Sequence, residues 1–491
     1  MVHKRRSPLL LTVLALTMTV TACTAGGAQR SDGMPGPGRH HDGSTWSGGE
    51  TVTEEDARST FGLDVDTASY GYARRLIMDG RLPEATAVRP EEFVNSFRQD
   101  YAEPSGDGFA VHVDGARLPD SHDASRQVRL MRVGLQTRSQ DEENRPDAAL
   151  TFVVDVSGSM DEPGRLDLVQ DALHTLVDQL RRTDSIAIVA FSSRARVVRE
   201  MTSLSDAGTL HDAIDSLRTQ DSTNLEAGLV LGYRVARDGF RPGATNRVIV
   251  LSDGLANVGA TEAEPILRRV RDEAAKQIAL LGVGVGSEYG DELMEQLADK
   301  GDGFVVYASE RAQARKVFVR QLPATLSVRA LDAKVQVSFE PSVVRSYRLI
   351  GYDNRAIDDE DFRDDRVDGG EVGPGHSVTA LYAVRLADEA SPSARAARVQ
   401  VRWTDPHDRR AAEAYESVTV ADLDRAFGVA SPRLRTCYAA AWFAQALQDG
   451  PYGREVRLAD LATIAEDAAD ASEDAEVKDL ARVIRRAEEA R

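Results

Sequence analysis

Cysteine is scarce in this sequence of 491 residues, which contains only Cys23 and Cys437. Two cysteines are too few for the disulfide framework that stabilises many small secreted domains. Cys437 lies in a helical pattern, where a cysteine is interpreted as a small, buried apolar residue. We therefore expect no disulfide framework.

An excess of basic residues is also lacking. The sequence has 79 Asp and Glu against 60 Lys and Arg, which gives a formal net charge of −19. Nucleic-acid-binding proteins rely on basic patches, so this balance argues against that class of function. The length is sufficient for about two to four domains.

The amino terminus lacks an apolar run long enough for a comfortable transmembrane helix. The apolar stretch 9–20 follows basic residues and has the length of a secretory signal. The small residues before Cys23 resemble the lipobox of bacterial lipoproteins, in which the cysteine is acylated and becomes the new terminus. This resemblance implies a signal peptide over 1–23, a lipidated Cys23 and a flexible tether over 24–52. An ordinary cleaved signal is the alternative; with Cys23 acylated, Cys437 has no disulfide partner.

A strand followed by a polar turn stands at the centre of the chain. The run Leu150–Val154 has the length and β-branched content of a strand buried on both faces. Asp155, Ser157 and Ser159 follow it at alternate positions, on the turn that leaves the strand's carboxyl end. In open α/β sheets this edge is where ligands bind, and such oxygens suit a hard cation. A turn that only caps the next helix is the alternative.

This Asp-x-Ser-x-Ser pattern resembles the metal-ion-dependent adhesion site of von Willebrand factor type A (VWA) domains. That family takes a fourth ligand from a threonine in a downstream loop and a fifth from an aspartate after a later strand. Thr223 and Asp253 occupy these two positions. The resemblance therefore implies a divalent cation, Mg²⁺ with Mn²⁺ or Ca²⁺ as alternatives, held by Asp155, Ser157, Ser159, Thr223 and Asp253.

The fold class expected from the patterning is α/β. Strand and helix patterns alternate along this part of the chain, and its last three helices are predicted over 262–275, 291–298 and 312–322. This alternation indicates a Rossmann-like parallel sheet flanked by helices. Period-two alternation from about 328 predicts antiparallel strands, and strands from 105–137 are expected to pair with them. The type A domain is then inserted in or beside an antiparallel β domain that precedes a helical tail. The expected parts are an N-terminal VWA-associated region 53–145, the VWA domain 146–325, a β-rich C-terminal domain 326–425 and a helical part 426–491.

Four phrases outside the metal motif extend the resemblance to bacterial VWA lipoproteins. This family has a characteristic N-terminal region and a C-terminal domain of unknown function. The phrases are Asp64–Tyr70, Arg89–Asn95, Tyr347–Arg355 and Gly373–Tyr382. Within the first phrase, residues 66–69 are expected to cap the helix that follows.

The resemblance implies a non-enzymatic function. We expect a membrane-anchored, cation-dependent protein-binding module for adhesion or assembly that faces the extracytoplasmic side. An acidic side chain of a partner protein is expected to complete the coordination shell of the cation. A metal-dependent hydrolase is one alternative, but it needs a general base, for which the flanking loops offer only Glu162 and Glu226. A structural envelope lipoprotein with a vestigial metal site is the other.

Overall fold

The computed structural model describes residues 49–119, 127–139, 145–220, 222–253, 278–286, 304–308, 328–367, 369–406, 408–450, 452–454 and 456–491, with single residues between 266 and 318. Cys23, the predicted signal peptide and most of the predicted tether lie outside these residues. So do most residues of the three helices predicted between 262 and 322. Within the described part, no helix is both long and apolar enough to cross a membrane.

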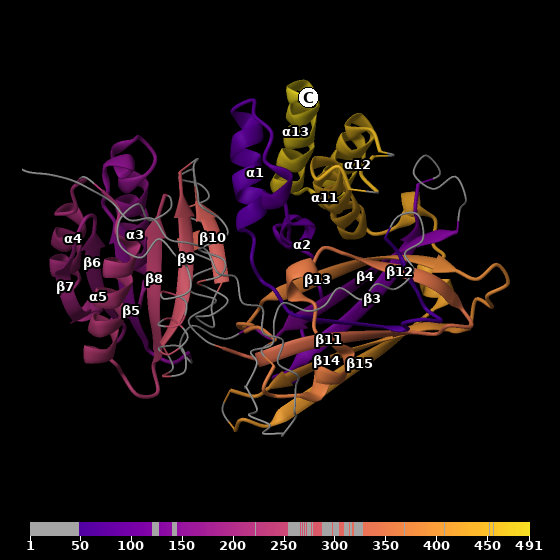
Figure 1. The fold of residues 1–491 in the computed structure, drawn as a ribbon, viewed down its shortest axis with the longest axis horizontal. Helices are drawn as coiled ribbons and strands as arrows, with labels where there is room; N and C mark the ends of the chain where they lie inside the picture. The colour runs from indigo at the N-terminus through magenta and orange to yellow at the C-terminus, as the bar shows by residue number, and fades with distance from the viewer. Residues whose placement is uncertain are drawn as a thin grey trace, which may run out of the picture. The chain divides into compact units, whose positions relative to one another are not determined.

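A six-stranded sheet organises the middle of the chain (Figure 1). Its strand order is β10-β9-β8-β5-β6-β7, and every pair is parallel except β6–β7. The strands are β5 (Ala148–Asp155), β6 (Ser185–Phe191), β7 (Ala195–Ser203), β8 (Thr245–Ser252), β9 (Ile278–Val285) and β10 (Phe304–Ala308). The α-helices of this part whose bounds the structure describes are α3 (Leu166–Gln179), α4 (Ala207–Asp215) and α5 (Leu225–Asp238).

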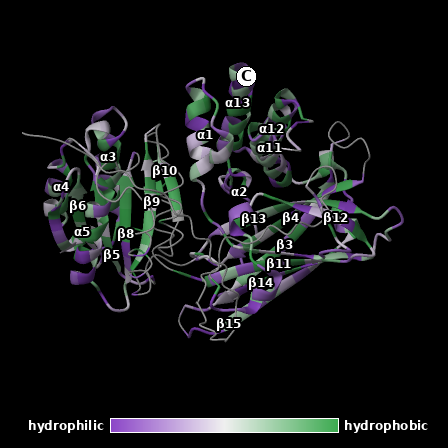
Figure 2. Cartoon of the chain, viewed as in Figure 1, coloured by the Kyte–Doolittle hydropathy of each residue, from purple (hydrophilic) through white to green (hydrophobic). Residues whose placement is uncertain are grey.

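Successive residues of β5 belong to opposite cores. Phe152 packs in one apolar cluster with Leu173 of α3, whereas Val153 packs in another with Leu229 of α5. This burial on both faces explains why β8 and β9 are coloured as hydrophobic in Figure 2, without polar alternation. The predicted α/β fold, a parallel sheet covered on both faces, is therefore confirmed.

Two antiparallel sheets form the β-rich part. Their orders are β1-β12-β13-β4-β3 and β15-β14-β11-β2. The first sheet contains β1 (Thr51–Val52), β3 (Phe109–Arg117), β4 (Val128–Thr137), β12 (Val344–Ile350) and β13 (Ser377–Leu386). The second contains β2 (Arg58–Gly62), β11 (Leu331–Phe339), β14 (Arg395–Thr404) and β15 (Ala411–Thr419), after which comes α10 (Val420–Leu423). Because β4 pairs with β13, the six-stranded sheet is an insertion between β4 and β11.

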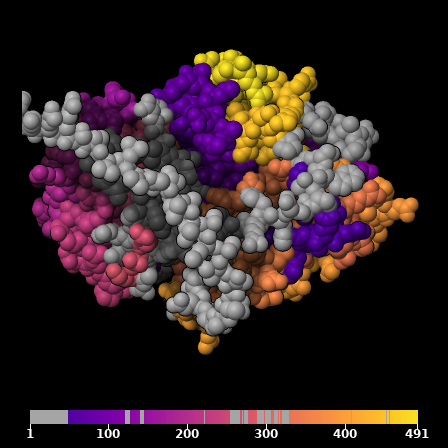
Figure 3. Space-filling model, in the orientation of Figure 1, coloured from indigo at the N-terminus to yellow at the C-terminus, as the bar shows by residue number. Residues whose placement is uncertain are grey.

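The five-stranded sheet has a core on each face. Tyr382 of β13 packs toward the four-stranded sheet, whereas its neighbour Leu381 packs toward a group of helices. These helices are α1 (Ala68–Met78), α2 (Pro90–Asn95), α11 (Pro432–Leu447), α12 (Leu458–Ser472) and α13 (Ala475–Ala490). In Figure 3 the indigo amino-terminal helices lie against the yellow carboxy-terminal ones, and Arg74 of α1 bonds to Asp479 of α13 at 2.6 Å.

The segment before α1 differs from the prediction. Residues 66–69 were expected to cap this helix, but its N-cap residue Thr67 makes no side-chain capping hydrogen bond. Asp66 instead accepts a hydrogen bond of 2.8 Å from the backbone N–H of Val305 in β10, and Asp64 pairs with Arg355 at 3.2 Å. The capping prediction is wrong because the acceptor of Asp66 faces a strand that is distant in sequence.

Candidate metal centre

Asp155 is the last residue of β5, and its side chain is fully buried. Its Oδ1 atom accepts a hydrogen bond of 2.8 Å from the backbone N–H of Ser157. The hydroxyl oxygens of Ser157 and Ser159 are 3.0 Å apart. Ser157 is the N-cap residue of the short 3-10 helix Gly158–Asp161, but its side chain makes no capping hydrogen bond, and the N-cap residue of α3 is Arg165. The alternative of a simple capping turn is therefore wrong.

Asp253 joins this group from the neighbouring strand. It follows β8, which is the parallel partner of β5, so the carboxyl ends of the two strands meet at one edge. Its Oδ1 atom accepts a hydrogen bond of 2.9 Å from the hydroxyl of Ser159. The hydroxyl of Ser252 donates in turn to Oδ2 of Asp155 at 2.6 Å. Hydrogen bonds thus connect the turn after β5 with the end of β8.

Thr223 lies in the loop before α5, and its side chain is buried. Two backbone hydrogen bonds tie this loop to the same sheet edge. The N–H of Gln220 donates to the carbonyl of Val156 at 2.6 Å, and the N–H of Asn224 donates to the carbonyl of Ser192 at 2.8 Å. The loop that carries Thr223 is therefore attached to the residue directly after Asp155. Three segments meet at this edge, and together they carry all five residues that the sequence analysis selected.

The site concentrates negative charge away from water. Asp155 and Asp253 are both buried, and burial raises the pKa of Asp155 to about 6, against hydrogen bonds from Ser252 and Ser157 that lower it. The nearby Asp253 carboxylate also raises this pKa. Nearby cationic charge stabilises buried carboxylates. Arg165 offers such charge, because its Nη1 donates to Oδ2 of Asp253 at 2.5 Å.

The donor set fits a hard divalent cation. It consists of two carboxylates and three hydroxyls, the oxygen chemistry that Mg²⁺, Mn²⁺ and Ca²⁺ prefer. Ser159 is exposed, so the group can be reached from solvent. A cation bound there supplies positive charge that attracts an anionic oxygen. The residues that would hold it are Asp155, Ser157, Ser159, Thr223 and Asp253.

Sequence reasoning missed two participants. Ser252 could have been found, because it directly precedes Asp253 at the end of a strand. Arg165 had no such signal, since it is separated from the motif by a turn. Of the two proposed bases, Glu162 pairs with Nη2 of Arg165 at 2.7 Å, and Glu226 lies in the first turn of α5.

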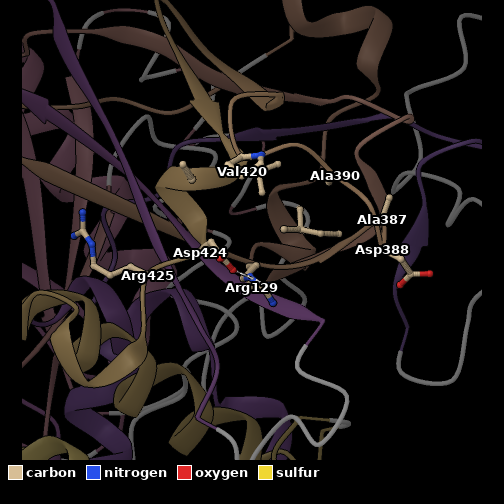
Figure 4. A pocket seen from close by; sticks show the side chains of 10 residues that line it. Arg129, Ala387, Asp388, Ala390, Val420, Asp424 and Arg425 are labelled. Atoms are coloured by element: carbon tan, nitrogen blue, oxygen red, sulfur yellow. Dashed lines mark hydrogen bonds and ion pairs between the residues drawn. The ribbon is translucent and has the colours of Figure 1, made fainter.

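A separate pocket of about 430 Å³ lies in the β-rich part (Figure 4). Arg129 of β4 pairs there with Asp424 at 2.7 Å, and Asp388 bonds to Gln127 at 2.9 Å. Three of its charged side chains, those of Arg129, Asp388 and Asp424, therefore already have partners within the protein. Across the described residues, no group of three or more His, Cys, Asp and Glu side chains is arranged to hold a metal ion. The serine-rich edge of the six-stranded sheet remains the candidate.

Comparisons with known proteins agree with this architecture. A family model described as von Willebrand factor type A domain matches residues 149–320, and one described as uncharacterized protein YfbK, C-terminal, matches 324–490. A third, described as von Willebrand factor, matches 45–128. Uncharacterized protein YfbK of Escherichia coli (strain K12) is 36% identical over 337 residues, which cover 67% of this chain. The match spans 58% of that protein's length.

Two solved structures are similar to parts of this chain. A von Willebrand factor type A protein from Catenulispora acidiphila has a TM-score of 0.47 at 17% identity, covering 78% of this chain and 91% of that one. Proximal thread matrix protein 1 from the mussel byssus, with a zinc-occupied MIDAS motif, has a TM-score of 0.31 at 22% identity, covering 36% and 46%. Type A domains bind a divalent metal ion at this motif and typically mediate metal-dependent protein interactions.

Proposed function

Because the chain carries a von Willebrand factor type A domain followed by the C-terminal domain of YfbK, and is homologous to that protein, we propose that it is a membrane-anchored protein-binding module that depends on a divalent cation. The observation that carries the proposal is the hydrogen-bonded connection from Ser157 through Ser159 to Asp253. These residues come from segments almost a hundred positions apart, yet they converge at one sheet edge together with buried Asp155.

The partner is proposed to offer a carboxylate. Hard cations keep exchangeable waters when the protein supplies few ligands, and an open cation site prefers an anionic oxygen to a neutral one. Ser159 is exposed at the edge, which supports access by a side chain from another protein. Asp or Glu on the partner surface is therefore the expected recognition element.

Binding is favoured over hydrolysis. A hydrolase needs a base that is free to take a proton from water. Glu162 is mostly exposed, with 67% of its side chain accessible, and its carboxylate pairs with Arg165. We therefore propose a module that binds and does not catalyse. Turnover of phosphoester or peptide substrates by the purified protein, lost on Asp155→Asn, would reverse this assignment.

Anchoring is proposed to occur through acylated Cys23 and the tether. The described part begins beside Glu50, whose buried carboxylate accepts hydrogen bonds from Arg385 at 2.9 Å, Ser346 at 2.5 Å and Tyr452 at 3.0 Å. This cluster would fix the tether to the β-rich part. Expression of Cys23→Ser should release the protein from the membrane fraction, and retention in that fraction would argue against the lipid anchor.

The central experiment is a calorimetric titration of the purified protein with Mg²⁺ and Mn²⁺. We expect binding by the wild type and by Ser193→Ala, which removes an exposed hydroxyl just after β6, but not by Asp155→Asn, which preserves side-chain shape. Capture of a partner should then require the cation and be abolished by a chelator. Absence of binding by the wild type would instead favour a structural envelope lipoprotein with a vestigial site.

A further inference from the structure

Arg165 is buried directly beside the candidate metal centre. Only 4% of its side chain is exposed, although the residue lies at the start of a helix. Its Nη1 donates to Oδ2 of Asp253 at 2.5 Å and to the carbonyl of Ser159 at 3.0 Å, and Nη2 contacts Glu162 at 2.7 Å. The guanidinium is therefore hydrogen-bonded to two of the five candidate ligand residues.

The neighbouring strand leaves space for this side chain. Gly286 follows β9 with a φ of +85°, and a Cβ atom added to it would lie 2.9 Å from Nε of Arg165. A larger residue would thus press on the guanidinium, in a backbone conformation that L side chains rarely adopt. The position of Arg165 is consequently determined by three separate parts of the sheet edge: the turn after β5, Asp253 and Gly286.

A fixed positive charge opposes cation binding. Asp155 and Asp253 together neutralise a divalent cation, so Arg165 leaves the loaded centre with one excess positive charge. Like charges repel strongly where water is excluded. Glu162 reduces this excess little, because its largely exposed carboxylate is screened by solvent.

From this charge balance we propose that Arg165 is the specificity-determining residue of the centre. Its positive charge lowers the affinity of the two carboxylates for a cation and leaves the cation-bound centre with a net positive charge. An anionic ligand is therefore favoured to complete the coordination shell of the cation. The centre is thereby selective for a carboxylate over a neutral donor. This inference rests on the proposed function, since it concerns the same site.

The test measures Mn²⁺ affinity by calorimetry with acetate as the carboxylate probe. Arg165→Gln should bind Mn²⁺ about tenfold more tightly than the wild type, because the repulsion is gone. Acetate should tighten Mn²⁺ binding by the wild type and have a smaller effect on the variant. Arg165→Lys, which keeps the charge, should remain within about threefold of the wild type. Arg199→Gln, on the distant edge strand β7, is the matched control and should behave as the wild type.

A second readout is the melting temperature without added cation. Arg165→Gln should lower it, since Asp253 loses its ion-pair partner, and Mn²⁺ should restore it. Equal or weaker Mn²⁺ affinity in a folded Arg165→Gln protein overturns the inference while leaving the proposed function intact. An Arg165→Lys protein whose Mn²⁺ affinity differs more than about tenfold from the wild type overturns it as well, even if the glutamine variant does not fold. Absence of Mn²⁺ binding by the wild type refutes both proposals.

Discussion

Glu91 provides a quantitative test of how the helical and β-rich parts are joined. It lies in α2 with only 3% of its surface exposed, and its Oε2 atom has no hydrogen-bond partner within the described structure. The carboxyl packs so closely on Gly351 that a Cβ there would lie 2.1 Å from Oε2. Burial raises the pKa of Glu91 from 4.5 to about 7, and the charge of Asp64 adds to the increase. Backbone hydrogen bonds, including one from Tyr352, act in the opposite direction.

The sign of the effect follows from proton binding. The folded protein holds the Glu91 proton more tightly than the unfolded chain does, so this group's contribution to stability is fully present below pH 4.5 and is lost as the pH rises through about 7. Between about pH 5 and pH 8 the loss amounts to roughly 2 to 3 kcal/mol. Glu91→Gln keeps the shape but cannot ionise. Relative to the wild type, it should therefore gain that amount of stability over this range.

The assay is urea unfolding at a series of pH values, followed by tryptophan fluorescence, because Trp442 is buried in the same apolar cluster as the helix α2 residue Phe93. Glu84→Gln, at an exposed position just upstream, serves as the control and should retain the pH dependence of the wild type. If Glu91→Gln and the wild type lose stability in parallel between about pH 5 and pH 8, Glu91 is not a neutral buried acid and the reasoning is refuted.

Two further predictions concern packing and charge. Asp184 is fully buried; burial raises its pKa, but hydrogen bonds from Arg145 outweigh this effect and hold the pKa below the usual value. Asp184→Asn should destabilise the type A domain by roughly 3 to 5 kcal/mol in urea unfolding. A loss of stability below about 1 kcal/mol would contradict a buried ion pair. Gly134→Ala should be destabilising by roughly 1 to 3 kcal/mol, because the new Cβ would lie 2.1 Å from the ring of Tyr101. Gly106→Ala, with no atom within 4 Å of the new Cβ, is the comparison, and equal melting temperatures for the two variants would show that the ring moves aside freely.

The elements that could be predicted were those whose pattern is local. Burial on both faces leaves a strand with an uninterrupted apolar run, which is why β5 and β8 were recognisable. The edge strand β7 is only half-buried and carries arginines, so its sequence has neither that run nor a clear alternation. The two-residue strand β1 is too short to leave any pattern.

The sequence by itself determined the chemistry of the centre, because residue types at alternate positions on a strand-end turn establish an oxygen donor set. The resemblance to type A domains added Asp253, and the parallel pairing of β5 with β8 brings it to the edge where Asp155 lies. Only the tertiary structure decided what surrounds these ligands. Ser252 and Arg165 reach the carboxylates through side-chain hydrogen bonds, and Asp66 bonds to a strand more than two hundred residues away. Such contacts depend on how separate segments pack, and hydrophobic periodicity does not encode the direction of a polar side chain.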